Sequence, residues 1–148
     1  MLQSPKSIFK NAVILAGFKQ AWQDSNPGIR GGHEEGGFVL QDLAGNLSIV
    51  RWPRGAQNSI SVLPHNNCKI GEYDIVASFH THPNTGSDFL QEPSETDKRA
   101  VRDDPNLKSP LYVGEFIISQ AIIYLITPAG QVREVDDTEN IFADLKEL

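Results

Sequence analysis

Two histidines and an aspartate at fixed spacing are the part of this sequence that most clearly predicts chemistry. The motif is His80-x-His82-Pro83, and Ser94 and Asp97 follow after ten further residues. Residues i and i+2 of a strand face the same side, so both imidazoles can reach one ion at the roughly 2.0–2.1 Å of zinc–nitrogen bonds. With Asp97 as the third ligand, one tetrahedral position stays open for water, which is typical of catalytic zinc. The spacing therefore predicts a catalytic zinc site.

Hydrolysis at such a site also needs a general base. A carboxylate has to take the proton from the attacking water and deliver it to the leaving amine, and Glu34 or Glu35 is the natural source. Both lie in a glycine-rich stretch at the entry to a predicted strand. By themselves they would be interpreted as a solvated acidic pair, and only the downstream metal motif makes them candidates.

Together these motifs resemble the JAMM family, also called JAB or MPN-plus. The shared pattern is Glu-x-x-Gly-apolar from Glu34 to Phe38, His-x-His-Pro from His80, and Ser-x-x-Asp from Ser94. The resemblance covers residues 34–97 by motif and the whole chain by the order of elements. It implies zinc-dependent hydrolysis of amide or isopeptide bonds, often at the C-terminal tail of ubiquitin-like proteins.

The resemblance also assigns roles by position. His80, His82 and Asp97 would hold one zinc ion, Glu34 would act as general base and acid, and Ser94 would donate a hydrogen bond to the tetrahedral oxyanion. Glu34 is preferred to Glu35 because the family keeps two residues between this glutamate and the glycine. The implied fold is α/β (α+β), a single cytidine-deaminase-like JAB/MPN domain over residues 1–148. Its central mixed sheet would be flanked by an N-terminal helix, a helix after the metal loop and a C-terminal helix.

Two departures bear on the substrate. The ten residues between Pro83 and Ser94 are more than the shortest family forms have, and nothing in the chain resembles the long insertions that grip ubiquitin in eukaryotic deubiquitinases. The sequence looks most like bacterial JAB domains, some of which occur as toxin or effector modules.

Ser94 and Asp97 have a second interpretation, because Ser-x-x-Asp is also typical of a helix N-terminus. A serine there accepts from the amides of the first turn, and acidic side chains complement the helix dipole. Asp97 can lie in a first turn and still bind metal, but the cap and the oxyanion role compete for the hydroxyl of Ser94.

Several other residues are left out of the predicted site. His33 is expected to be an exposed loop histidine, and Trp52 is expected to lie in the core. His65 and Cys68 are too few to close a structural zinc site, so Cys68 is predicted to be a small buried or partly buried thiol.

The elements that must position these residues can be predicted from periodicity. Tyr73 to His80 alternates as a strand with one apolar face, with Ile75 and Phe79 on the same side, and Pro83 ends its pairing. The other predicted elements are an amphipathic helix over 7–24, a hairpin of 38–41 and 47–52, a helix over 94–102 after an irregular 84–93, strands over 112–119, 121–127 and 132–135, and a C-terminal helix.

Composition narrows the class of protein. The chain has 148 residues, 39% of them hydrophobic, and this predicts one domain. A net charge of −6 with scattered basic residues argues against nucleic acid as a partner. No stretch suits a membrane span, and Cys68 as the only cysteine excludes an intrachain disulfide and a four-thiolate site. A cytoplasmic, soluble protein is expected, with delivery as a secreted effector left open.

The leading hypothesis is thus a zinc metallopeptidase acting on a protein or peptide. Its substrate could be the tail of a ubiquitin-like or sulfur-carrier protein. If the chain is instead a toxin module, the substrate would be a protein of the attacked cell, and an immunity protein would be a partner. The alternative is a zinc-holding interaction or DNA-repair-associated domain, similar to RadC relatives, without peptidase activity. The sequence leaves the substrate and the oligomeric state open.

Overall fold

The structure is a computed structural model that describes residues 2–28, 30–86 and 91–146. Within these residues it is a mixed α+β fold with one seven-stranded sheet and four α-helices. In chain order the elements are α1 (Pro5–Phe9), α2 (Ala12–Asp24), β1 (Gly36–Gln41), β2 (Leu47–Arg51), η1 (Asn66–Cys68), β3 (Lys69–Ile70), β4 (Tyr73–Thr81), α3 (Glu95–Arg102), η2 (Pro105–Leu107), β5 (Glu115–Ile118), β6 (Ile122–Ile126), β7 (Val132–Asp137) and α4 (Thr138–Lys146). This order confirms the predicted succession of helix, strands, helix, strands and helix.

The sheet is mixed, as expected. Its strand order is β2-β1-β4-β5-β6-β7, with β3 paired to β4. Neighbouring strands are antiparallel except for β4 and β5, which are parallel. A parallel pair needs a crossover connection, and here α3 lies within it. The chain therefore leaves the end of β4, runs through α3, and returns to the same sheet beside β4.

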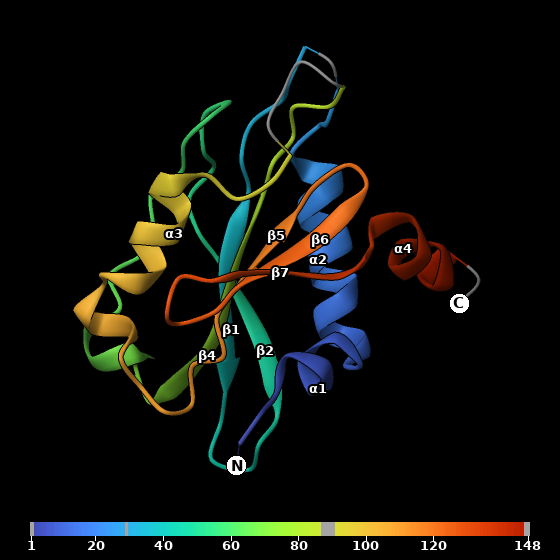
Figure 1. The fold of residues 1–148 in the computed structure, drawn as a ribbon. Coiled ribbons are helices and arrows are strands. Elements are labelled where there is room, and N and C mark those ends of the chain that lie inside the picture. The colour runs from blue at the N-terminus through green and yellow to red at the C-terminus, as the bar shows by residue number, and fades with distance from the viewer. Residues whose placement is uncertain (1, 29, 87–90, 147–148) are drawn as a thin grey trace.

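Helices cover both faces of the sheet (Figure 1). α3 lies on one face, and α1, α2 and α4 lie on the other. Two buried clusters fill the layers: Phe18 of α2 packs with Phe79 and Phe116, while Val101 of α3 packs with Ile117 and its neighbours. Because both faces are covered, the central strands β4 and β5 are buried along most of their length.

The prediction of one apolar face for β4 is wrong. The register with β1 skips Val76, which marks a β-bulge, and this places Ile75 in the cluster on the α3 side. Val76 and Phe79 belong to the opposite cluster, beneath α2. Strict alternation from Tyr73 missed the bulge, since one extra residue shifts every side chain before it to the other face. Ser78 and His80 follow the bulge and keep a common face.

The single N-terminal helix predicted over 7–24 is two helices. The side chain of Asn11 accepts hydrogen bonds from the backbone amides of Val13 and Ile14, and so caps α2 at its start. Apolar spacing runs through the break, so periodicity alone did not show it. At the other predicted boundaries, α3 begins one residue later than expected, after its cap Ser94, and β5 begins at Glu115 instead of residue 112.

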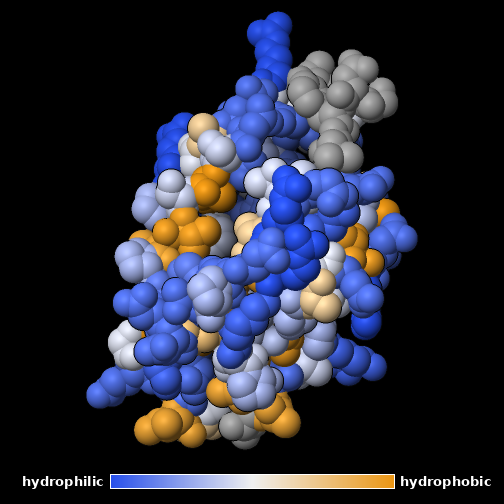
Figure 2. Space-filling model, turned by 60° about the vertical axis from the view of Figure 1, so that its left-hand side comes forward, coloured by the Kyte–Doolittle hydropathy of each residue, from blue (hydrophilic) through white to orange (hydrophobic). Residues whose placement is uncertain are grey.

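Among the described residues, no helix is both long enough and apolar enough to cross a bilayer. Figure 2 shows the face on the α3 side, which is mainly hydrophilic with hydrophobic residues in small groups. The large hydrophobic side chains that are exposed are spread along the chain, at Leu2, Val13, Leu43, Val62, Tyr73 and Val132.

Candidate metal centre

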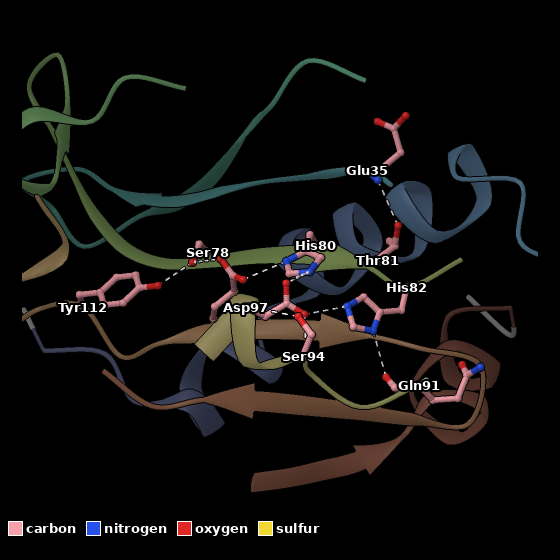
Figure 3. A network of polar contacts seen from close by, with 10 residues as sticks. Glu35, Ser78, His80, Thr81, His82, Gln91, Ser94, Asp97 and Tyr112 are labelled. Atoms are coloured by element: carbon pink, nitrogen blue, oxygen red, sulfur yellow. Dashed lines mark hydrogen bonds and ion pairs between the residues drawn. The ribbon is translucent and has the colours of Figure 1, made fainter. Parts of the chain in front are cut away.

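The structure brings the three predicted ligands together. His80 lies near the end of β4, His82 follows just beyond it, and Asp97 lies in the first turn of α3. One ligand atom from each lies within 4.8 Å of the others. Nε2 of His80 is 3.5 Å from Oδ1 of Asp97, and Nε2 of His82 is 3.1 Å from Oδ2. Figure 3 shows both imidazoles turned toward the carboxylate. The predicted convergence is confirmed, and the arrangement is compatible with a bound metal ion.

The polar atoms of this cluster fit a metal ion. Nε2 of His80 is buried and has no hydrogen-bond partner among the described residues, and such atoms are rare because they cost free energy. Burial lowers the pKa of His80, but the carboxylates of Glu115 and Asp97 outweigh it and raise that pKa well above its ordinary value. Burial likewise raises the pKa of Asp97, while the adjacent imidazoles of His80 and His82 outweigh this and hold it well below its usual range. Two imidazole nitrogens and a carboxylate oxygen are a ligand set that zinc accepts.

Both imidazoles are held by their other nitrogen. Nδ1 of His80 is 2.9 Å from Oε2 of Glu115, at the start of β5, and Nδ1 of His82 is 3.1 Å from the backbone carbonyl oxygen of Gln91. Each acceptor favours a proton on Nδ1, and this leaves Nε2 of both rings directed at Asp97. The two anchors differ in charge, since one is a carboxylate and the other a neutral carbonyl.

A buried network extends behind His80. Oγ of Ser78 donates to Oε1 of Glu115 at 2.8 Å, and the same hydroxyl lies 2.6 Å from the hydroxyl of Tyr112. Ser78 is paired with Glu115 in the parallel ladder between β4 and β5. Sequence reasoning missed these three residues. The available signal was Glu115, a charged residue among the mainly apolar residues 112–118.

Ser94 is the N-cap of α3, so its helix-cap interpretation is confirmed. Its hydroxyl accepts from the amide of Asp97 at 3.1 Å, and its own amide donates to Oδ2 of Asp97 at 2.9 Å, a reciprocal capping box. A hydroxyl has one donor hydrogen besides its two acceptor sites. The cap uses only an acceptor site, so Ser94 keeps a hydrogen to donate, and the two roles do not exclude each other.

Glu34 shares a cavity with two of the predicted ligands, His82 and Asp97. The cavity has a volume of about 220 Å³ and is lined by Glu34, Asn58, His82, Pro83, Asn84, Ser94 and Asp97. The backbone of Glu34 is fixed by hydrogen bonds with Gly55 and Ala56, and the residue is only 8% exposed. Burial raises the pKa of its carboxyl, although the imidazoles of His80 and His82 oppose the shift.

Glu35 is engaged elsewhere. Its carboxylate pairs with Arg51 and with His33, and Figure 3 shows its side chain pointing away from the predicted ligands. The geometry therefore favours Glu34 over Glu35 as the residue that can act in the cavity. His33 is partly buried in this ion pair, so the expectation of an exposed histidine is wrong, while its exclusion from the ligand set agrees with the structure.

The remaining candidates are structural. The imidazole of His65 pairs with the carboxylate of Asp104. Cys68 is buried, as predicted, and burial raises the pKa of its thiol to about 11. Trp52 is 4% exposed and lies in the core cluster on the α3 side, also as predicted.

Comparison with known proteins identifies no relative. No family model, no curated protein and no solved structure matches the chain. Any function proposed for this protein therefore depends on the geometry of the site and on the motifs.

The raised pKa of Glu34 has a consequence for stability. When burial raises the folded-state pKa of a carboxyl above its ordinary value of 4.5, the ionised form costs free energy in the folded protein. Stability is then highest below the unfolded-state pKa and falls as pH rises through the folded-state value. Glu34→Gln should raise the denaturation midpoint of metal-free protein at pH 7, with a difference that shrinks toward acid pH. Denaturant titrations across pH measure this, and a difference that did not vary with pH would contradict it.

Proposed function

We propose that this protein is a JAMM-type zinc metallopeptidase, with a JAB/MPN fold, that hydrolyses an amide or isopeptide bond in a protein or peptide. The observation that carries the proposal is the buried Nε2 of His80, which has no hydrogen-bond partner among the described residues and lies beside His82 and Asp97. The mixed sheet, with a helix that follows the metal loop and helices on both faces, agrees with such a fold.

One zinc ion would be held by Nε2 of His80, Nε2 of His82 and the carboxylate of Asp97. When bound, zinc supplies a Lewis acid that polarises a substrate carbonyl and lowers the pKa of water. Three protein ligands are the number found at catalytic zinc sites, whereas structural sites use four. The ligand set thus favours an enzyme over a structural metal site.

Glu34 would move the proton in this reaction. Its ionised carboxylate accepts a proton from the attacking water, and its protonated form then donates that proton to the nitrogen of the leaving amine. A carboxyl whose pKa is raised toward the working pH serves both steps better than an ordinary glutamate, because general catalysts work best with a pKa near that pH. Ser94, which faces the same cavity, would donate its hydroxyl hydrogen to the oxyanion.

The size and lining of the cavity suggest the form of the substrate. About 220 Å³ accommodates a scissile bond and the atoms next to it, and not a folded domain. The carboxamides of Asn58 and Asn84 on the cavity wall hydrogen-bond to each other, and their remaining hydrogens and lone pairs suit the amide groups of an extended chain. A flexible peptide tail, such as that of a ubiquitin-like or sulfur-carrier protein, fits this description. So does an exposed segment of the target of a toxin, in which case an immunity protein would be a partner.

The alternative is a zinc-holding interaction or DNA-repair-associated domain that resembles RadC relatives. Such a domain has no need for a buried glutamate beside the metal ligands. Glu34 is buried in the same cavity despite the cost of burying a carboxylate, and this favours the hydrolase.

A hydrolysis assay tests the proposal. Zinc-loaded protein should cleave members of a mixture of internally quenched peptides and lysine isopeptides, measured as fluorescence release. Activity should disappear after dialysis against a chelator and return when zinc is added back. Zinc-loaded protein that cleaves nothing in the mixture, or activity that survives complete removal of metal, would count against a metallopeptidase.

A further inference from the structure

The carboxylate of Glu115 is unusual in its position. Glu115 is 7% exposed and lies at the start of β5. Among the described residues its ion-pair partner is His80, and no lysine or arginine pairs with it. The position is fixed by the backbone: Gly114 has φ of +130°, and a Cβ there would lie 2.3 Å from the carbonyl oxygen of Ile126. The chain thus enters β5 at the point that sets Glu115 beside Ser78 and behind His80.

A buried carboxylate without a cationic partner is costly, so its contacts show what compensates for it. Oε2 of Glu115 lies 2.9 Å from Nδ1 of His80 and can accept a hydrogen bond from it. Oε1 of Glu115 accepts a hydrogen bond from Oγ of Ser78 at 2.8 Å. His80 thus contacts Glu115 through Nδ1, while its Nε2 lies beside Asp97. Metal-bound histidines commonly donate their second nitrogen to such a carboxylate, which fixes the ring and its tautomer and makes it a better ligand.

We propose that Glu115 is a positioning residue that holds His80 with the proton on Nδ1, so that Nε2 is presented to the metal ion as a strong ligand. Ser78 orients the Glu115 carboxylate, and Tyr112 completes the network at the far end. The inference rests on the proposed function, because it assigns Glu115 a role toward the same metal. Among the described residues, Nδ1 of His82 contacts a backbone carbonyl, that of Gln91, whereas Nδ1 of His80 contacts a side-chain carboxylate that a substitution can change.

Zinc affinity of the full-length protein measures this role without any substrate. Glu115→Gln keeps a neutral acceptor of similar shape and removes the charge, and it should weaken zinc binding by about 10- to 100-fold in competition with a chromophoric chelator. Glu35→Gln is the matched control, because Glu35 is also a buried glutamate paired with a histidine, His33, but lies outside the cavity. Its zinc affinity should equal that of the wild type.

A purely structural role would not change the electronic state of the His80 ring. Proton–nitrogen-15 correlation NMR of the zinc-loaded proteins measures the chemical shift of the proton on Nδ1 of His80. That proton should lie strongly downfield in the wild type and in Glu35→Gln, and should shift upfield in Glu115→Gln. If Glu115→Gln does not fold, Ser78→Ala provides a second variant, which removes the donor to Oε1 and should weaken zinc binding to a smaller extent.

The outcomes separate the two proposals. Wild-type protein that takes up no zinc would overturn the metal site, and with it the role of Glu115. Wild-type protein that binds zinc, together with a Glu115→Gln variant of equal affinity and unchanged His80 signal, would overturn the positioning role alone.

Discussion

Glu34→Gln should retain zinc and lose turnover. The amide keeps the shape of the side chain but can neither accept the proton of the attacking water nor return it to the leaving amine. General acid–base catalysis typically contributes 10²- to 10⁴-fold, so kcat should fall by about that factor. Zinc content should stay at the wild-type level, because Glu34 lines the cavity but is not one of the clustered ligands. The measurements are steady-state cleavage of a quenched peptide and elemental analysis of the same preparation.

Glu35→Gln is the control for this variant, since the two glutamates are neighbours in the sequence and both are buried. Glu35 pairs with Arg51 and His33 and does not line the cavity, so its variant should turn over substrate at close to the wild-type rate. Equal losses in the two variants, or full activity in Glu34→Gln, would contradict the assignment of Glu34 as general base.

Asp97→Asn should abolish stoichiometric zinc binding. A neutral amide oxygen lacks the charge that makes a carboxylate a zinc ligand, although it can still accept the capping hydrogen bond from the amide of Ser94. Asp97→Ala loses both the ligand and the cap acceptor. The metal-free Ala variant should therefore be less stable than the metal-free Asn variant, by about 1 kcal/mol for the lost hydrogen bond. Isothermal titration with zinc and denaturant unfolding measure the two effects separately.

Asp103→Asn, at the other end of the same helix, serves as the control for zinc binding. Its carboxylate is exposed and pairs with Arg102 at the C-terminal end of α3, whereas Asp97 lies in the first turn beside the imidazoles. It should bind zinc like the wild type. Zinc binding by Asp97→Asn at wild-type affinity would show that the aspartate is not a ligand.

The convergence of His80, His82 and Asp97 could be predicted from sequence because it depends on spacing over short stretches of the chain. Alternation on a strand turns His80 and His82 to one side, and Pro83 ends pairing just beyond them. The cap pattern at Ser94 also locates the start of α3, which carries Asp97 in its first turn. Each of these rules acts over a few residues, and the structure agrees with each of them.

Glu115 could not be predicted in this way, because its contact with His80 depends on the parallel pairing of β4 with β5. That pairing joins residues 37 positions apart, Ser78 and Glu115, across a crossover whose register no local pattern encodes. The bulge at Val76 in β4 could not be predicted for a similar reason, because it is defined by pairing with the neighbouring strand β1. The break at Asn11 is different, since an asparagine inside a predicted helix is a local cap signal that the apolar periodicity outweighed.

The most direct test of the account is the metal content of protein purified without chelator, measured by elemental analysis for the wild type, His80→Ala, His82→Ala and His65→Ala. His65 is the matched control, because it also pairs with an aspartate, Asp104, but outside the metal cluster. About one zinc per chain is expected in the wild type and in His65→Ala, and none in the other two variants. A wild-type protein without metal that also takes up none on titration with zinc, or variants that keep the full metal content, would contradict this expectation.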